Sequence, residues 1–242
     1  MTDVESTVIL DNSFNESKKA LVMTNCKDNE ISGNFLYSNE FFGIQLADCD
    51  SNTFTGNTIR DNNQSGVYAS KCRLNSFSSN QLRNNKENGV YFIESNNNTL
   101  ETNDIQSNIH GINMSNSKGN EIQGNYVSKN EKYGLIIHNC NETKISGNEL
   151  KFNAKSGIFL NSTRRNELSL NRIYNNTEHG IYLKGCTGLK VSENNVSKNQ
   201  GQGLSLFAAH SNEFIENSVV NHTKNYAINL KSSDSNLFEN NT

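Results

Sequence analysis

NEIQGNYVSKN at residues 120–130, followed by GLII at residues 134–137, is one copy of a pattern that fills the 242-residue chain. The glycine that opens its second part returns at one phase, in steps of 23 residues with a single step of 22. These glycines are Gly43, Gly66, Gly89, Gly111, Gly134, Gly157, Gly180 and Gly203. A fixed period of this size is typical of a solenoid, in which one short unit stacks on the next.

Apolar residues occupy three places in each repeat. Ile44 and Leu46 follow a glycine and alternate with other residues, which predicts a strand with one buried face. A second strand centres on Ile31 and Phe54, and a third on positions equivalent to Leu36. We therefore predict an all-β, right-handed parallel β-helix with three short strands per coil and about ten coils of about 23 residues. The right hand is taken by analogy with parallel β-strand crossovers.

One asparagine position is invariant between the second and third strands. It holds Asn34, Asn57, Asn80, Asn103, Asn125, Asn148, Asn171, Asn194, Asn217 and Asn241. We expect each to adopt the left-handed αL conformation at a sharp corner and to bond to the amide of the next coil. Two further series, beginning at Asn29 and Asn39, predict ladders at other positions, the second of them broken by His222. Such ladders imply parallel, in-register strands about 4.8 Å apart.

The composition agrees with a chain made almost wholly of paired strands. The sequence has 45 Asn and no Pro, and Pro lacks the N–H that a central strand must donate. The net charge is −3, from 22 basic and 25 acidic residues, without a basic tract. Nucleic acid is therefore excluded as an expected partner. No apolar stretch is long enough to span a membrane.

The repeat runs without a linker, so residues 1–242 are expected to form a single β-helix domain. Because repeats are in progress at both ends, we expect a segment of a longer protein with its caps or flanking domains missing. The first residues, MTDVESTVIL, lack the features of a signal peptide. We expect an extracellular, periplasmic or cell-envelope location with the leader absent, and a cytoplasmic location is the alternative.

These repeats resemble the right-handed parallel β-helix repeats of the pectin-lyase-like superfamily. The most similar group is the Asn-rich NosD type, also described as carbohydrate-binding and sugar-hydrolysis domains. The resemblance covers essentially the whole chain and rests on structural ladder positions. It implies the β-helix fold, and enzymes of this superfamily bind polysaccharide along an outer sheet or groove.

The NosD-type resemblance raises the question of copper, which His residues would bind. His110 and His179 share a phase but lie three coils, or about 14 Å, apart. His138, His210 and His222 occupy other positions. Because no pair is placed to share an ion at about 2 Å, we expect neither a metal site nor any other cofactor.

All five cysteines fall at one phase of the repeat: Cys26, Cys49, Cys72, Cys140 and Cys186. Other coils place Ser or Thr there, so the phase indicates a small buried corner residue. We expect stacked free thiols. A redox or metal role is the alternative, and a disulfide between neighbouring coils would distort the ladder.

Aromatic residues recur on the outward side of the strand that follows the glycine. They are Tyr68, Tyr91, Phe159 and Tyr182, interrupted by Asn113 and Ile136. Sugar rings stack on exposed aromatic faces, so these four are the candidate carbohydrate-binding residues. The alternative is that stacked rings stabilise the sheet without a ligand.

Charged residues stack in two series. Asp48, Lys71 and Glu94 lie in three successive coils and are the only weak catalytic candidates, because a lyase needs a base and a hydrolase needs two carboxylates. An ion-pair ladder is the simpler interpretation of these three. Alternating lateral pairs are also expected for the second series, Glu121, Lys144, Glu167, Lys190 and Glu213.

The repeat offers no long loop and no complete catalytic set. We therefore favour a scaffold of the cell envelope or exterior that binds a polysaccharide, a cell-surface glycan or a protein partner. The first alternative is a polysaccharide-active enzyme: a lyase, glycoside hydrolase or epimerase. The second is a structural spacer that associates end to end through exposed strand edges.

Overall fold

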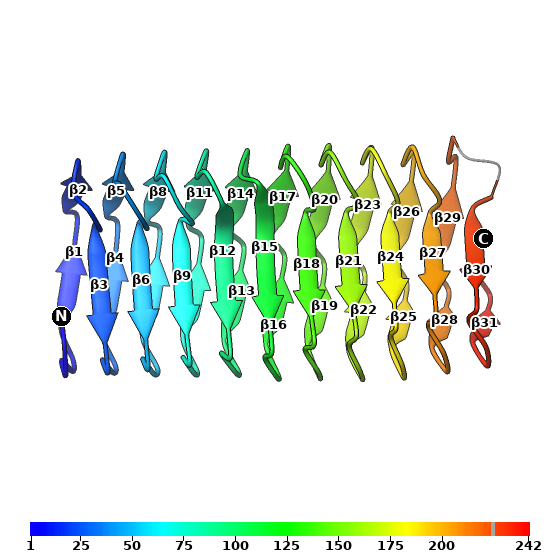
Figure 1. Ribbon diagram of the computed structural model, residues 1–242, viewed down its shortest axis with the longest axis horizontal. Coiled ribbons are helices and arrows are strands. Elements are labelled where there is room, and N and C mark those ends of the chain that lie inside the picture. Colours follow the sequence, from blue (N-terminus) through cyan, green and yellow to red (C-terminus); the bar gives the residue numbers. More distant parts are fainter. Residues whose placement is uncertain (224–225) are drawn as a thin grey trace.

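The computed structural model describes residues 1–223 and 226–242. Each coil contributes one strand to each of three parallel sheets, and successive coils lie side by side along the long axis (Figure 1). The two chain ends lie at opposite ends of this stack (Figure 1). The predicted parallel β-helix with three strands per coil is thus confirmed.

The three sheets contain 10, 11 and 10 strands. Sheet 1, which follows the repeating glycines, contains β3 (Leu21–Thr24), β6 (Ile44–Ala47), β9 (Val67–Ser70), β12 (Asn88–Ile93), β15 (His110–Ser115), β18 (Leu135–His138), β21 (Ile158–Asn161), β24 (Ile181–Lys184), β27 (Leu204–Phe207) and β30 (Ile228–Lys231). Sheet 2 contains β1 (Val8–Leu10), β4 (Glu30–Ser32), β7 (Thr53–Thr55), β10 (Ser76–Ser78), β13 (Thr99–Glu101), β16 (Glu121–Gln123), β19 (Lys144–Ser146), β22 (Glu167–Ser169), β25 (Lys190–Ser192), β28 (Glu213–Ile215) and β31 (Leu237–Glu239). Sheet 3 contains β2 (Ser13–Asn15), β5 (Phe35–Tyr37), β8 (Thr58–Arg60), β11 (Gln81–Arg83), β14 (Asp104–Gln106), β17 (Tyr126–Ser128), β20 (Glu149–Lys151), β23 (Arg172–Tyr174), β26 (Asn195–Ser197) and β29 (Ser218–Val220).

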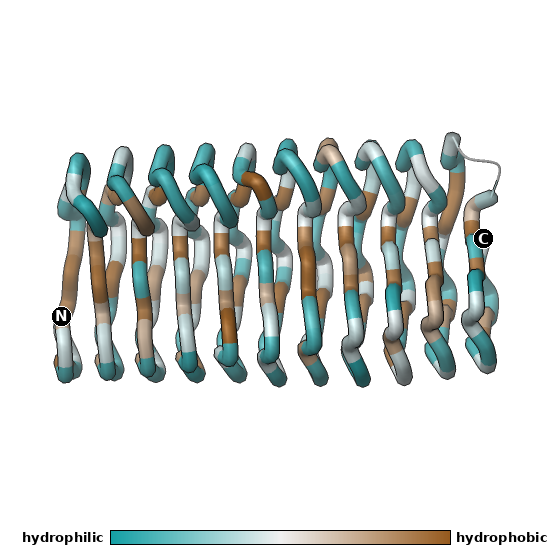
Figure 2. Tube along the Cα trace, viewed as in Figure 1, coloured by the Kyte–Doolittle hydropathy of each residue, from teal (hydrophilic) through white to brown (hydrophobic). Residues whose placement is uncertain are grey.

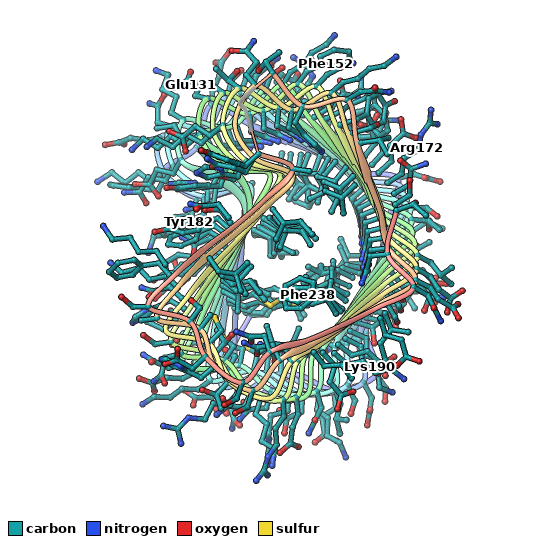
Figure 3. All side chains as sticks on the ribbon, turned by 90° about the vertical axis from the view of Figure 1, so that its right-hand side faces the viewer. Glu131, Phe152, Arg172, Tyr182, Lys190 and Phe238 are labelled. Carbon is teal, nitrogen blue, oxygen red and sulfur yellow. The ribbon has the colours of Figure 1, made fainter. Side chains whose placement is uncertain are left out.

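The core is a narrow column of apolar side chains. Along β6, Ile44 and Leu46 are buried while Gln45 lies on the outer face, and the same alternation of hydropathy is visible along the strands in Figure 2. Phe238 points into the interior of the coil, whereas Tyr182 points outward (Figure 3). Equal phases pair, so identical side chains meet: the rings of Phe54 and Phe77 stack at 4.5 Å with an interplanar angle of 5°.

The asparagine ladders satisfy the polar groups that they bury. Asn57 donates its backbone N–H to Asn80 Oδ1 at 2.9 Å and its Nδ2 to the same oxygen at 3.0 Å. Its Nδ2 also donates to the carbonyl of Ile31 at 2.8 Å. The buried Asn57 amide therefore has partners in both the preceding and the following coil, which removes the cost of an unpaired polar group.

The expected αL conformation of the ladder asparagines is wrong. The left-handed residue is the one before each of them, as at Gly56 (φ 64°) and Ser79 (φ 55°), which precede Asn57 and Asn80. The chain bends at that preceding residue. The asparagine that follows the bend has a buried, inward-pointing side chain, and this position lets its amide form the ladder hydrogen bonds.

The repeating glycines are required by close packing and not by unusual dihedral angles. A Cβ atom at Gly89 would lie 2.7 Å from the carbonyl oxygen of Gly111 and 2.5 Å from Ile105 Cγ2. Sheet 1 therefore begins where its backbone touches both the next coil and sheet 3. Only glycine leaves that space free.

The cysteine prediction is confirmed for the thiols themselves. All five are free and buried, and the backbone N–H of Cys49 donates to Cys72 Sγ at 3.4 Å. A hydrogen bond with the Cys72 thiol lowers the pKa of Cys49 to about 7. The same pairing and burial raise the pKa of Cys72.

Candidate functional site

The four predicted aromatic residues lie on the outer face of sheet 1, but in two separate groups. Tyr68 and Tyr91 are in-register neighbours on β9 and β12. The ring of Phe42, which precedes Gly43, stacks on Tyr68 at 4.9 Å. We call Phe42, Tyr68 and Tyr91 the first aromatic group.

The second aromatic group consists of Tyr133, Phe159 and Tyr182. Phe159 lies 5.0 Å from Tyr133 and 4.9 Å from Tyr182, with interplanar angles of 30° and 13°. The rings of His110 and His179 extend the group at its two ends, at 5.7 Å from Tyr133 and 5.4 Å from Tyr182. Ile136 interrupts the series of outward aromatic residues, and in its coil the ring that stacks on Phe159 comes from Tyr133 instead.

Phe42 and Tyr133 were not among the predicted residues because they belong to a different phase of the repeat. Both come directly before a repeating glycine, whereas Tyr68 and Phe159 come two residues after one. Rings from these two phases meet over the glycine, which has no side chain to separate them. An aromatic residue one position before the glycine was the available signal.

The two groups present their rings differently. Parallel stacking in the second group turns the faces of Phe159 toward its neighbours. Tyr91 instead makes an angle of 71° with Tyr68 at a centroid distance of 5.7 Å. All four predicted residues are half-buried. The Tyr91 ring is therefore not stacked in parallel on its neighbour. In the next coil the residue at the same position is Asn113, which has no ring to cover Tyr91.

A short polar network lies beside Tyr91, between the two groups. Asn113 Nδ2 donates to Asn88 Oδ1 at 3.1 Å, and Asn88 Nδ2 donates to Ser65 Oγ at 3.0 Å. Ser65 Oγ in turn donates to Glu87 Oε2 at 3.2 Å. Asn88 and Ser65 are buried and support the network from within, whereas Asn113 and Glu87 are half-buried. The Asn113 amide and the Glu87 carboxylate are therefore the polar groups that a sugar stacked on the ring could reach.

The electrostatics of the second group follow from burial. Burial lowers the pKa of His110 to about 4, helped by the charges of Lys132 and Lys155. Burial also raises the pKa of Tyr133. His110 is thus a neutral ring at neutral pH and belongs to the aromatic stack.

The weak catalytic candidates Asp48, Lys71 and Glu94 lie at the corner that follows sheet 1. Each is exposed and has a positive φ, of 51°, 56° and 51°. Among the described residues none of the three has an ion-pair partner, so the expected ion-pair ladder is absent there. At these left-handed corners the in-register neighbours do not bring their charged ends together.

The second charge series has the predicted register. Glu121 pairs with Lys144, Lys144 with Glu167, Glu167 with Lys190, and Lys190 with Glu213. Lys144 Nζ contacts Glu121 Oε1 at 3.1 Å. This is the one ion pair of the series in the part of the chain that the structure describes.

A polar and aromatic cluster on sheet 3 was not predicted. Lys151 Nζ donates to Glu149 Oε1 at 2.7 Å and to the Tyr174 hydroxyl at 2.9 Å. The Tyr174 hydroxyl donates to the same Glu149 oxygen at 2.5 Å. Hydrogen bonds from Lys151 and Tyr174 lower the pKa of Glu149, and the Glu149 carboxylate raises the pKa of Lys151.

Comparison with known families assigns the chain. Residues 92–242 match the family described as "Right handed beta helix region", and residues 1–132 match the family described as "Periplasmic copper-binding protein (NosD)". This chain belongs to the right-handed β-helix and NosD families. No curated protein matches the sequence significantly.

Solved structures share the β-helix at low sequence identity. A variant of the periplasmic alginate epimerase AlgG is 15% identical with a TM-score of 0.72, covering 97% of this chain and 77% of its own. The mannuronan C-5 epimerase AlgE4 A-module of Azotobacter vinelandii is 11% identical with a TM-score of 0.62, at 93% and 72% coverage. The Dettilon tailspike protein is 14% identical with a TM-score of 0.65, at 99% and 60% coverage. At these identities the likeness concerns the fold.

The residues of this β-helix do not fit the copper site that the NosD description names. Within residues 1–223 and 226–242, no three His, Cys, Asp or Glu side chains gather closely enough to hold a metal ion. The stacked thiols are occupied instead by hydrogen bonds to the backbone, as between Cys49 Sγ and the carbonyl of Ala47 at 3.2 Å. In the same described ranges, no helix is long and apolar enough to cross a membrane.

Proposed function

We propose that this β-helix is a noncatalytic carbohydrate-binding scaffold whose contact surface is the first aromatic group with the adjoining polar network. The observation that carries the proposal is the Tyr91 ring, turned 71° from its neighbour Tyr68 and paired in register with Asn113 of the next coil. A sugar ring stacked on Tyr91 would have hydrogen-bond partners in the next coil. Similar structures named as an alginate epimerase and as a mannuronan epimerase support a carbohydrate ligand.

The proposed location is the cell envelope or the exterior. The matching NosD family is described as periplasmic, and the similar AlgG structure is named as a periplasmic enzyme. Both make a location outside the cytoplasm the consistent choice for a glycan-binding chain.

The test is affinity electrophoresis of the purified chain in gels that contain a panel of polysaccharides. Tyr91→Ala should weaken binding about tenfold, because a stacked aromatic contact is worth roughly 1–1.5 kcal/mol. Tyr182→Ala should weaken it much less, since that ring already stacks on Phe159. Phe35→Ala, which removes a ring 53% exposed on another sheet, is the matched control.

Equal effects of Tyr91→Ala and Phe35→Ala, or no binding to any polymer, would rule out this surface. The same polymers address the enzyme alternative. Incubation with uronate polymers should yield neither unsaturated products nor new reducing ends nor a changed uronate composition. Any of these products, lost in Asp48→Asn or Glu94→Gln, would replace the scaffold proposal with a lyase, hydrolase or epimerase.

A further inference from the structure

The cluster on sheet 3 leaves one strongly basic group without a carboxylate in direct contact. Arg172 pairs in register with Glu149 and its charge helps to lower the Glu149 pKa, but the Glu149 Oε1 atom is hydrogen-bonded to Lys151 and Tyr174 instead. The Arg172 guanidinium lies 4.7 Å from the Tyr174 ring centroid and is exposed. Tyr174 is fixed by its hydrogen bonds to Glu149 and Lys151. Of the described residues, none forms an ion pair with Arg172. The Arg172 guanidinium group is therefore held against a fixed ring, and its N–H groups can donate two parallel hydrogen bonds to an anion.

Lys151 is a largely buried member of this cluster and holds its rings in place. Its side chain is only 18% exposed, and its ammonium lies 4.8 Å from the Tyr126 ring and 5.3 Å from the Tyr174 ring. The ammonium forms an ion pair with Glu149, with 2.7 Å between Lys151 Nζ and Glu149 Oε1. Since Glu149 and Lys151 neutralise each other, the cluster keeps the net positive charge of Arg172.

Phe152 adds an exposed ring at an unfavourable backbone position. Its side chain is 49% exposed and its φ is 55°, although bulky residues rarely adopt positive φ. The same corner holds Ser38, Asp61, Asn84, Ser107, Lys129, Asn175, Lys198 and Asn221 in other coils. The fold therefore does not require an aromatic residue there. The Phe152 ring meets the Tyr174 ring at 6.3 Å with an interplanar angle of 67°, which places it beside the Arg172 side chain. The part of the ring that stays exposed suits a ligand with a flat apolar face.

Two further cations flank Phe152 along this corner. Lys129 lies one coil before it and Lys198 two coils after it, at spacings of about 5 Å and 10 Å. Both are exposed, and neither has an ion-pair partner among the described residues. Figure 3 shows Phe152 and Arg172 on the outside of the coil, on a different face from Tyr182. Lys129, Phe152, Arg172 and Lys198 form what we call the basic patch.

We infer that the basic patch is a second glycan-binding surface, selective for sugars that carry a carboxylate or sulfate group. Phe152 offers a stacking face, Arg172 pairs with the acidic group, and Lys129 and Lys198 meet charges on neighbouring sugars of the same chain. A nucleic acid fits less well, because the whole molecule has a net charge of −3 and the patch has one exposed ring rather than a row. The surface is separate from the sheet 1 site and does not depend on it.

The test is calorimetric titration of the full chain with four probes: oligogalacturonate, a sulfated dextran oligomer, a neutral dextran oligomer of matched length, and single-stranded DNA. Arg172→Gln and Phe152→Ser should each weaken binding of the acidic sugars about tenfold. Phe152→Ser restores a residue that other coils carry at this corner, so the fold should be kept. The two acidic probes separate carboxylate from sulfate recognition.

Matched controls are Arg165→Gln and Leu74→Ser, which alter an exposed arginine and a 61% exposed apolar corner residue away from the patch. Both should bind like the unchanged chain. Equal affinity for neutral and acidic dextran, absence of binding to both acidic probes, or equal losses in the controls would overturn the inference. Tighter binding of DNA that depends on Arg172 would assign the patch to nucleic acid instead.

Discussion

At the scale of single residues, the fold shifts the protonation of the buried His110 ring. Its ring stacks 5.7 Å from Tyr133, and burial, with Lys132 and Lys155 nearby, lowers its pKa from 6.5 to about 4. The unfolded chain binds a proton to this ring below pH 6.5, while the folded chain binds it only near pH 4. The free energy of unfolding is therefore highest above pH 6.5 and falls as the pH drops toward 4.

We predict that this loss is smaller in His110→Gln. Between about pH 7 and pH 4.5 the unchanged chain should lose roughly 1–2 kcal/mol more than the variant, after allowing for solvent screening. Urea unfolding at both pH values measures the difference. His222, whose pKa burial also lowers, is present in both proteins and cancels. Equal losses in the two proteins would show that His110 does not titrate as described.

The sequence predicts which side chains stack but not every backbone angle. Identical residues at Asn57 and Asn80 are enough to indicate a ladder, because in-register pairing brings them together. The αL angle belongs to the residue before, and its identity varies from Gly56 to Leu170. A corner that accepts so many residue types leaves no consistent signal in a single sequence.

At the scale of elements, the start of each sheet 1 strand is the tightest contact between sheets. We predict that Gly89→Ala destabilises the fold by about 2–3 kcal/mol, because the new methyl group would lie 2.7 Å from the Gly111 oxygen. Gly56→Asn is the control: it changes a positive-φ corner where no atom lies within 4 Å of an added Cβ. Urea denaturation should show a loss under about 1 kcal/mol for the control. A similar loss in both variants would mean that close packing does not explain the glycine repeat.

The two candidate sites differ in how much of them the repeat predicts. Tyr68 and Tyr91 share one phase of the repeat and are direct neighbours, so the sequence predicts that they meet. The contact of Lys151 with Tyr126 joins two different phases in adjacent coils, so the sequence does not predict it. These residues do not repeat along the chain. Only the lateral geometry of sheet 3 brings them together.

At the scale of the whole molecule, the solenoid makes one coil an exchangeable unit. Each coil contacts mainly its neighbours, so stability is close to a sum of coil and interface contributions. Coils are interchangeable because each residue contacts the residue at the same phase of the next coil, as Asn34 contacts Asn57 and Cys26 contacts Cys49. Removing one full period should therefore preserve every type of stacking.

We predict that deletion of residues 44–66, which is one 23-residue period, gives a folded chain. Gly43 would be joined to Val67, Asn34 would stack on Asn80, and Cys26 on Cys72. Circular dichroism should keep its β-sheet signal and urea unfolding should remain cooperative, with a lower free energy of unfolding because one coil interface is lost. Deletion of residues 44–54 is the control, since it removes about half a period and places polar corners in the core. That chain should fail to fold, and equal behaviour of the two deletions would contradict a stack of interchangeable coils.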